Sequence, residues 1–167
     1  EWIQLVTAPN KGALTASIYN DLFINKEGDR FIAEDGRRDV LSGAVLEQPD
    51  KMFWWINDGH TVDDILGGVD ISGRVIRDTV DDKFMFMADT IEELAEKIGA
   101  DPEKFRKAVD DFNAAVDGAD DPFGRQLFEY KIDKAPYIAN RGRAVVHHTM
   151  GGIEINENCQ VLDASGN

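Results

Sequence analysis

The sequence predicts an α+β fold, in which a small mixed sheet is combined with a helical hairpin. Short apolar runs bounded by polar, glycine-containing turns occur in both halves of the chain and are typical of strands. Between residues 90 and 117, apolar residues instead recur at helical spacing, with recognisable start and stop signals. The chain has 167 residues, of which 43% are hydrophobic. We therefore expect one domain, residues 1–167, with a substantial core.

A strand, a hairpin, a helix and a second strand are predicted in the first third of the chain. Residues 1–6 suit a strand, and residues 22–32 form two apolar runs around a polar turn, which predicts a hairpin. A helix is predicted over residues 39–48, because the apolar residues share one face and Pro49 ends the pattern. The aromatic run at residues 52–56 predicts a buried strand. It lacks the interleaved basic residues of a platform for stacking bases.

Residues 90–117 carry the clearest pattern, which is two helices joined by a short turn. Thr90 and Glu93 form a capping box, in which each side chain satisfies a free amide at the helix start. Gly99 fits the C-terminal cap of the first helix, and Pro102 suits the first position of the second. We therefore predict a helical hairpin that packs on a core and has no chemistry of its own.

The other segments are assigned as follows. Residues 57–88 fit no element, although they contain an apolar run at residues 84–87. Residues 120–125 are a predicted loop. Residues 136–148 and 152–162 have strand character, so strands are expected at both ends of the chain.

The composition excludes several classes of function. The formal net charge of −14 argues against nucleic-acid binding, which needs basic patches that replace counterions. No apolar stretch approaches the roughly 20 residues of a membrane-spanning helix. Cys159 is the only cysteine, so neither an intrachain disulfide nor a paired-cysteine site is expected. Gly-x-Gly-x-x-Gly is also absent, so we expect no dinucleotide-binding strand–turn–helix in this chain.

The run from His147 to Gly152 is the first candidate for chemistry. A glycine pair lets the backbone approach a flat ligand, and neighbouring histidines can hold an anion, pass a proton or contact a cofactor. Because adjacent strand residues point to opposite faces, we expect His147 and His148 to have different roles. A structural role is the alternative for each, and the glycine pair favours a functional one. No metal site is expected, because zinc needs three or four close ligands and His60 is the only other histidine.

The second candidate lies at the start of the predicted helix over residues 39–48. Asp39 is well placed there, because a negative charge is stabilised at a helix N-terminus. Arg37 and Arg38 are not favoured by the same dipole. They are interpreted either as a charged helix start or as groups that hold a carboxylate in a bidentate fork.

Six motifs occur in an order that resembles one flavoprotein family. They are Trp2-Ile3-Gln4, Asn25-Lys26-Glu27-Gly28-Asp29-Arg30-Phe31, Arg38-Asp39, Ala88-Asp89-Thr90-Ile91-Glu92-Glu93-Leu94-Ala95, Asp121-Pro122-Phe123-Gly124-Arg125 and the run His147–Gly152. Together they resemble the flavoprotein subunit of the fumarate reductase and succinate dehydrogenase superfamily. Within it, they resemble the soluble flavocytochrome c fumarate reductases and urocanate reductases. The resemblance covers nearly the whole chain except residues 57–88.

This resemblance implies that the chain is the capping, or substrate-clamp, domain of a larger FAD-dependent oxidoreductase. Short flanks would return to an FAD-binding domain outside residues 1–167, which accounts for the missing nucleotide fingerprint. The family reduces a C=C bond of a small unsaturated carboxylate, in anaerobic respiration, by hydride transfer from the flavin and protonation by an arginine. The isolated chain is then expected to fold and to be inactive.

The resemblance also assigns roles to single residues. Arg38 precedes an aspartate, as the family's proton donor does, and is the expected catalytic acid, although arginine ordinarily has a pKa above about 12. His147 is the expected anchor for a substrate carboxylate. The residues expected to face the flavin are His148, Thr149, Met150, Gly151 and Gly152.

The substrate-binding positions depart from the fumarate reductase pattern. Thr15 matches a threonine that contacts the second carboxylate of fumarate, but Ala16 stands where a glutamate is expected. Tyr19 stands where an arginine relays protons. These changes favour a monocarboxylic enoate of the urocanate type over fumarate, with Tyr19 beside its apolar or aromatic end.

Two alternatives come from other functional classes. One is a structural or binding module derived from this family without catalysis, and the other is an oxidoreductase of the succinate dehydrogenase or L-aspartate oxidase type. The doubled histidine argues against the second. The resemblance further implies a cytochrome or FMN domain as electron donor and a periplasmic or extracytoplasmic location, with a cytoplasmic one as the alternative.

Overall fold

The computed structural model describes residues 3–9, 21–68, 75–80, 83–149 and 151–166. Its strands are β1 (Ile3–Pro9), β2 (Leu22–Ile24), β3 (Met52–Asn57), β4 (Met85–Ala88) and β5 (Tyr137–Thr149). Its helices are α1 (Arg38–Glu47), α2 (Val62–Gly67), α3 (Ile91–Ile98) and α4 (Pro102–Val116), with short 3-10 turns at Pro49–Lys51 and Ile76–Thr79. The α+β class and the helical hairpin are therefore confirmed.

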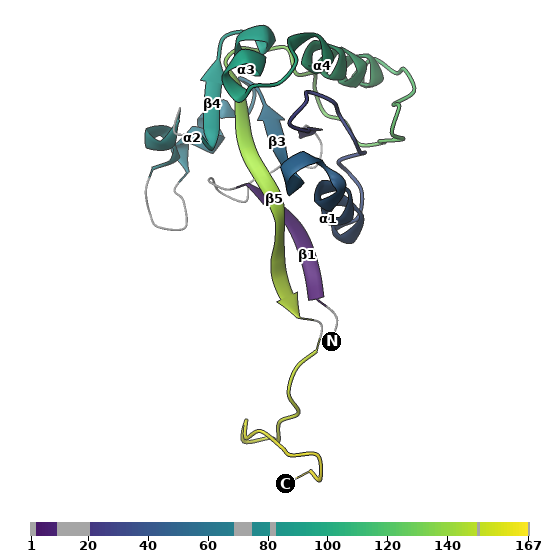
Figure 1. Ribbon diagram of the computed structural model, residues 1–167, viewed down its shortest axis with the longest axis vertical. Helices are drawn as coiled ribbons and strands as arrows, with labels where there is room; N and C mark the ends of the chain where they lie inside the picture. Colours follow the sequence, from purple (N-terminus) through teal and green to yellow (C-terminus); the bar gives the residue numbers. More distant parts are fainter. Residues whose placement is uncertain (1–2, 10–20, 69–74, 81–82, 150, 167) are drawn as a thin grey trace.

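The sheet is organised around the long strand β5 (Figure 1). The order is β1-β5-β3-β2, while β4 also pairs with β5, and every described pair is antiparallel. The first part of β5 pairs with β3 and β4, and its second part pairs with β1. Figure 1 shows β5 running from the α3–α4 end of the molecule to the opposite end, where β1 begins. Strand β5 thus connects the region of β3 and β4 to the region of β1.

Strand β3 contributes to a core on each face of the sheet. Met52, Trp54 and Ile56 pack with α3 and α4 in the larger core, whereas Phe53 and Trp55 pack with α1 on the other face. This division follows from the alternation of side chains along a strand. Because both faces are covered, the run is apolar throughout, as the sequence predicted for a buried strand.

The caps of the helical hairpin also follow the sequence. The Thr90 hydroxyl accepts from the amide of Glu93 at 3.1 Å, and Gly99 ends α3 in the left-handed region with φ 72°. The Glu93 carboxylate reaches back to the amide of Asp89 at 3.4 Å, so the reciprocal half of the capping box is shifted by one residue. The Asp101 carboxylate caps α4, which begins at Pro102.

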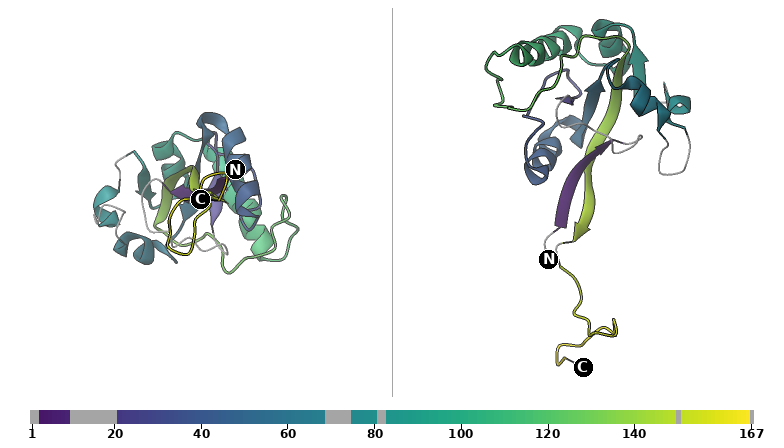
Figure 2. Two further views of the ribbon diagram at one scale, coloured as in Figure 1. Left: turned by 90° about the horizontal axis from the view of Figure 1, so that it is seen from below. Right: turned by 180° about the vertical axis from the view of Figure 1, so that it is seen from behind.

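Three expectations need correction. Residues 152–162 are not a strand, because a single bridge joins Ile155 to Val161, and both side chains are at least half exposed. Figure 2 shows this segment leaving the body of the molecule, and nearly all of its described residues are exposed. The hairpin over residues 22–32 has only one bridge beyond β2, from Ile24 to Arg30. Residues 57–88 contain α2 and β4, which share a small third core with β5.

Among the described residues, no helix has both the length and the apolar character that crossing a membrane requires.

Candidate functional site

The start of α1 separates the two arginines that the sequence places together. Arg37 forms a fork with Asp39, with Nε–Oδ1 at 3.1 Å and Nη2–Oδ2 at 2.9 Å. Arg38 is exposed, and no hydrogen bond or ion pair joins its guanidinium to another described residue. The predicted fork therefore exists, but Arg37 makes it within the chain. Arg38, by contrast, is exposed and unpaired among the residues that the structure describes.

Helix α1 lies against the half of the sheet that carries the His147–Gly152 run. It contacts β1 and β5, as Figure 1 shows, and its inner face packs Leu41 and Val45 beneath the sheet. The backbone of β5 continues through His147 and His148 to Thr149. Arg38 thus begins a helix that packs on β1 and β5, the two strands that lead to the histidine run, although the structure describes only the backbone of the two histidines.

His147 lies at an irregularity in the β1–β5 ladder. Gln4 pairs with His148 and Leu5 pairs with Val146, so His147 is the extra residue at a register shift. A β-bulge of this kind interrupts the alternation of side chains and is common beside active sites. We expected the two histidines to face opposite sides because side chains alternate along a regular strand. That alternation does not apply across the bulge at His147.

Beyond β5 the chain leaves open space around the glycine pair. The Thr149 hydroxyl donates to the carbonyl of Gly151 at 3.0 Å. A Cβ atom at Gly151 or Gly152 would meet no described atom of this chain within 4 Å. Packing within the described chain thus does not require glycine at either position. The predicted site residues Thr15, Tyr19 and Met150 lie outside the described residues.

A cluster of buried charges, which was not predicted from the sequence, joins the segment before α1 to the loop after α4. It consists of Arg30, Glu34, Asp121 and Arg125, whose side chains are at most 3% exposed. Although burial disfavours its charge, the hydrogen bond from Arg30 holds the pKa of Asp121 below its usual range. The spacing of Arg30 and Glu34, four residues apart, was the available signal.

Asp21 adds a third acidic group beside this cluster. Burial raises the pKa of its carboxyl group to about 7, against the effect of a hydrogen bond from Asn57 at 3.2 Å. Arg125 donates to the carbonyl oxygen of the same residue. The Glu34 cluster therefore adjoins a carboxyl group whose pKa is raised to about 7.

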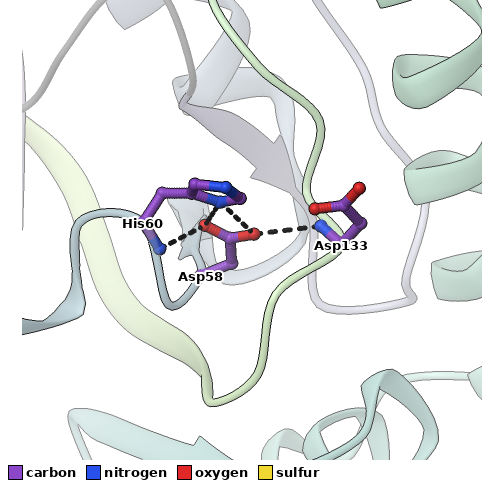
Figure 3. Close-up of side chains that lie close together, drawn as sticks. All are labelled: Asp58, His60 and Asp133. Carbon is purple, nitrogen blue, oxygen red and sulfur yellow. Dashed lines mark hydrogen bonds and ion pairs between the residues drawn. The ribbon is translucent and has the colours of Figure 1, made fainter.

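Asp58, a further buried carboxylate, follows β3 near the start of β5 (Figure 3). It accepts from the amide of His60 at 3.0 Å and from the amides of Asp133 and Lys134 at 2.9 Å each. It also lies 3.0 Å from Nδ1 of His60, whose ring stacks on Tyr130. The neighbouring Gly59 has no room for a Cβ, because the atom would clash with the carbonyl of Ala135.

Asp58, His60 and Asp133 bring possible metal ligands within 4.8 Å of one another. Each Asp58 oxygen already accepts hydrogen bonds, and Nδ1 of His60 faces that carboxylate. A cation would therefore have to displace amide donors from a buried group, which is unfavourable. The arrangement suits a clamp between two loops better than a metal centre.

An open pocket of ≈ 280 Å³ lies beside α4 and brings together none of the predicted site residues. Its two lysines are already ion-paired, Lys104 with Asp29 at 2.7 Å and Lys107 with Asp111 at 2.5 Å. The pocket therefore lacks an unpaired cation on which an anionic ligand could depend.

The chain is similar to known flavoproteins over most of its length. The family model described as an FAD binding domain matches residues 21–167. The NADH:acrylate oxidoreductase of Vibrio harveyi is 35% identical over 163 residues, which cover 95% of this chain and 16% of that protein. The urocanate reductase of Eggerthella lenta is 37% identical over 146 residues, which cover 84% of this chain and 23% of that protein.

A solved structure has the same fold. The open conformation of a flavocytochrome c3 fumarate reductase matches with a TM-score of 0.78 and 30% identity, over 99% of this chain and 29% of that one. The chain thus spans less than a third of each of these three proteins.

Proposed function

The chain belongs to the FAD binding domain family, and on that premise we propose that it is the capping domain of an FAD-dependent reductase. The substrate would be a small unsaturated carboxylate whose C=C bond is reduced. The family is the one that the six motifs predicted. Related proteins named for acrylate, urocanate and fumarate reduction support a reductase over a structural module.

The observation that supports this proposal most directly is the exposure of Arg38. A proton donor must be able to reach the substrate, and Arg38 is exposed and has no partner among the described residues. Its neighbour Arg37 is already paired with Asp39.

The residues present fit a flavin at the end of β5. Gly151 and Gly152 are exposed, and a side chain at either position would meet no described atom, so a flat ring held by another domain can approach the backbone there. His148, Thr149 and Met150 would face the same ring. When bound, the reduced flavin supplies a hydride to one carbon of the double bond.

The protein residues then bind and protonate the substrate. His147, at the bulge in β5, would hold the carboxylate by a hydrogen bond. Arg38 would transfer one guanidinium proton to the carbon that gains the electron pair of the C=C bond. The neutral guanidine would then regain a proton from solvent, which completes the addition of hydride and proton.

We further propose that a monocarboxylic enoate is preferred over fumarate. Ala16 stands in place of a glutamate suited to a second carboxylate, and Tyr19, in place of a relay arginine, would contact the remote end of the substrate. Two similar proteins are named for the monocarboxylates acrylate and urocanate. The cytochrome or FMN electron donor and the extracytoplasmic location stay predictions.

The test replaces each of the adjacent arginines in the full-length flavoenzyme. With acrylate as substrate and reduced viologen as electron donor, Arg38→Gln is expected to lower kcat at least about 100-fold, the contribution of a general acid. Arg37→Gln, the matched control, should change kcat less than about threefold, because its side chain is exposed and paired with Asp39. Full activity of Arg38→Gln with bound FAD would contradict the proposed role.

A further inference from the structure

The segment that leads into α1 is held by one fully buried carboxylate, that of Glu34. Four donors surround it: the amide of Phe23 at 3.0 Å, Nε and Nη2 of Arg30 at 2.9 and 2.7 Å, and Nη1 of Arg125 at 2.9 Å. The Glu34 side chain is 0% exposed. Its position is therefore determined by contacts with three different parts of the chain.

These contacts connect the elements that bear the proposed substrate residues. Arg125 also donates to the carbonyl oxygen of Asp21, the first described residue after the stretch that contains Thr15 and Tyr19. Glu34 itself lies four residues before Arg38. One cluster thus joins the start of β2 to the segment that enters α1.

A second acidic residue strengthens the same connection. The carboxylate of Asp35 accepts from the amides of Gln126 at 2.8 Å and Leu127 at 3.1 Å. The loop that supplies these amides also contains Arg125. The chain before α1 is therefore attached to this loop through both Glu34 and Asp35.

The charges of the cluster balance within the protein. Glu34 and Asp121 face Arg30 and Arg125, and the two guanidinium groups also lie over the ring of Phe112, at 5.9 and 4.9 Å. Such a group of paired, desolvated charges accepts few alternative geometries, because each displacement leaves a buried charge without a partner. It is suited to holding a neighbouring segment at one position.

We propose that Glu34, with Arg30 and Arg125, is a positioning residue for Arg38, a role that rests on the proposed function of Arg38 as proton donor. Glu34 touches neither substrate nor flavin. It fixes the entry of α1 so that the Arg38 guanidinium lies where the substrate carbon needs its proton. An error of about 1 Å in such a position can lower a rate about 100-fold.

The control for this proposal is Asp58, a buried carboxylate outside the Glu34 cluster. Asp58 is as deeply buried and accepts a similar number of hydrogen bonds. It adjoins Asn57, which pairs with Ile138 at the start of β5, whereas His147 lies nine residues further along that strand. At about 3.3 Å per residue this is roughly 30 Å. The donors to Asp58 are the amides of His60, Asp133 and Lys134. A change at Asp58 therefore tests the loss of a buried carboxylate that does not bond to the segment entering α1.

The experiment compares Glu34→Gln and Asp58→Asn in the full-length holoenzyme, with acrylate as substrate. For Glu34→Gln we expect kcat to fall about tenfold or more, KM to change less than threefold, and the solvent deuterium isotope effect on kcat to rise. The isotope effect should rise because proton delivery becomes the slow step. For Asp58→Asn we expect a lower Tm but kcat within about twofold of the parent and an unchanged isotope effect.

Two results would overturn the positioning role: an unchanged kcat in Glu34→Gln, or equal losses of kcat in both variants without a change in isotope effect. If Glu34→Gln yields no folded holoenzyme, Asp35→Ala decides, because its carboxylate is only partly buried. It must lower kcat more than KM changes and raise the isotope effect, and an unchanged kcat contradicts the role. An active Arg38→Gln would instead overturn the proposed function itself.

Discussion

Two buried carboxylates, Glu34 and Asp58, are stabilised in different ways. Glu34 is surrounded mainly by two guanidinium groups, one from Arg30, four residues earlier, and one from Arg125, 91 residues later. Asp58 is surrounded mainly by backbone amides of two adjacent loops and by His60 (Figure 3). Both satisfy the rule that a buried charge must be paired or hydrogen-bonded.

The difference shows what each carboxylate can do. Backbone amides fix the course of the loops that donate them, so Asp58 organises the approach to β5. Charged side chains attach separate elements to one another, so Glu34 connects β2, the loop after α4 and the entry to α1. A network of full charges is also more sensitive to the loss of one member than a set of neutral donors.

The largest expected effect on stability comes from removing a charge from the Glu34 cluster. Arg125→Met should lower the free energy of unfolding by about 3–5 kcal/mol, because it leaves Glu34 with less compensation in a buried site. The Arg125 side chain is 0% exposed, whereas Arg106 forms an exposed fork with Glu92 at 2.7 and 2.8 Å. Arg106→Met should therefore cost less than about 1 kcal/mol. Urea unfolding of the chain measures both, and equal losses would remove the contrast between buried and exposed pairs.

The next largest effect is a pH dependence of stability that arises from Asp21, beside the same cluster. Because burial raises the pKa of Asp21 to about 7 from 3.8, the folded chain keeps a proton that the unfolded chain releases. The stabilisation is complete below about pH 4 and is lost as the pH rises through 7. Between pH 5 and 8 the parent should lose up to about 3 kcal/mol relative to Asp21→Asn.

The control for this pH dependence is an exposed carboxylate. Asp50 is paired with Lys26 at 2.5 Å, and the hydrogen bond from that lysine lowers the pKa of Asp50. Asp50→Asn should therefore follow the parent between pH 5 and 8. Urea midpoints at several pH values provide the measurement. Parallel curves for the parent and Asp21→Asn would show that Asp21 does not titrate in this range.

Much of the fold was predictable because local patterns and burial agree. The aromatic run of β3 is apolar on both faces, and the structure has a core on each. The caps at Thr90, Gly99 and Pro102 depend on neighbours in sequence, so they are visible without a structure. The prediction of strand structure at residues 152–162 was wrong for the opposite reason. Their alternating pattern needs a covering surface that the described residues do not supply.

The candidate site was predictable only in part. Arg38 and the His147–Gly152 run are recognisable as motifs, but the pairing of Arg37 with Asp39 and the bulge at His147 appear only in three dimensions. The Glu34 cluster was missed because charged residues in a sequence indicate a solvated surface. Arg30 and Arg125 are 95 positions apart, and nothing local shows that both face one carboxylate.

The smallest effect on stability is expected at Asp58, because its backbone amide donors are neutral and can be satisfied by another acceptor. In Asp58→Asn, the amide oxygen can accept from the amides of Asp133 and Lys134, while the new NH2 group donates to Nδ1 of His60. Only the amide of His60 then loses its partner, so we expect a loss of about 1–2 kcal/mol in urea unfolding. Asp133→Asn should change stability by less than about 0.5 kcal/mol, since its exposed side chain makes none of these bonds. A loss at Asp58 as large as that of Arg125→Met would show that amide donors and charged partners stabilise buried carboxylates equally.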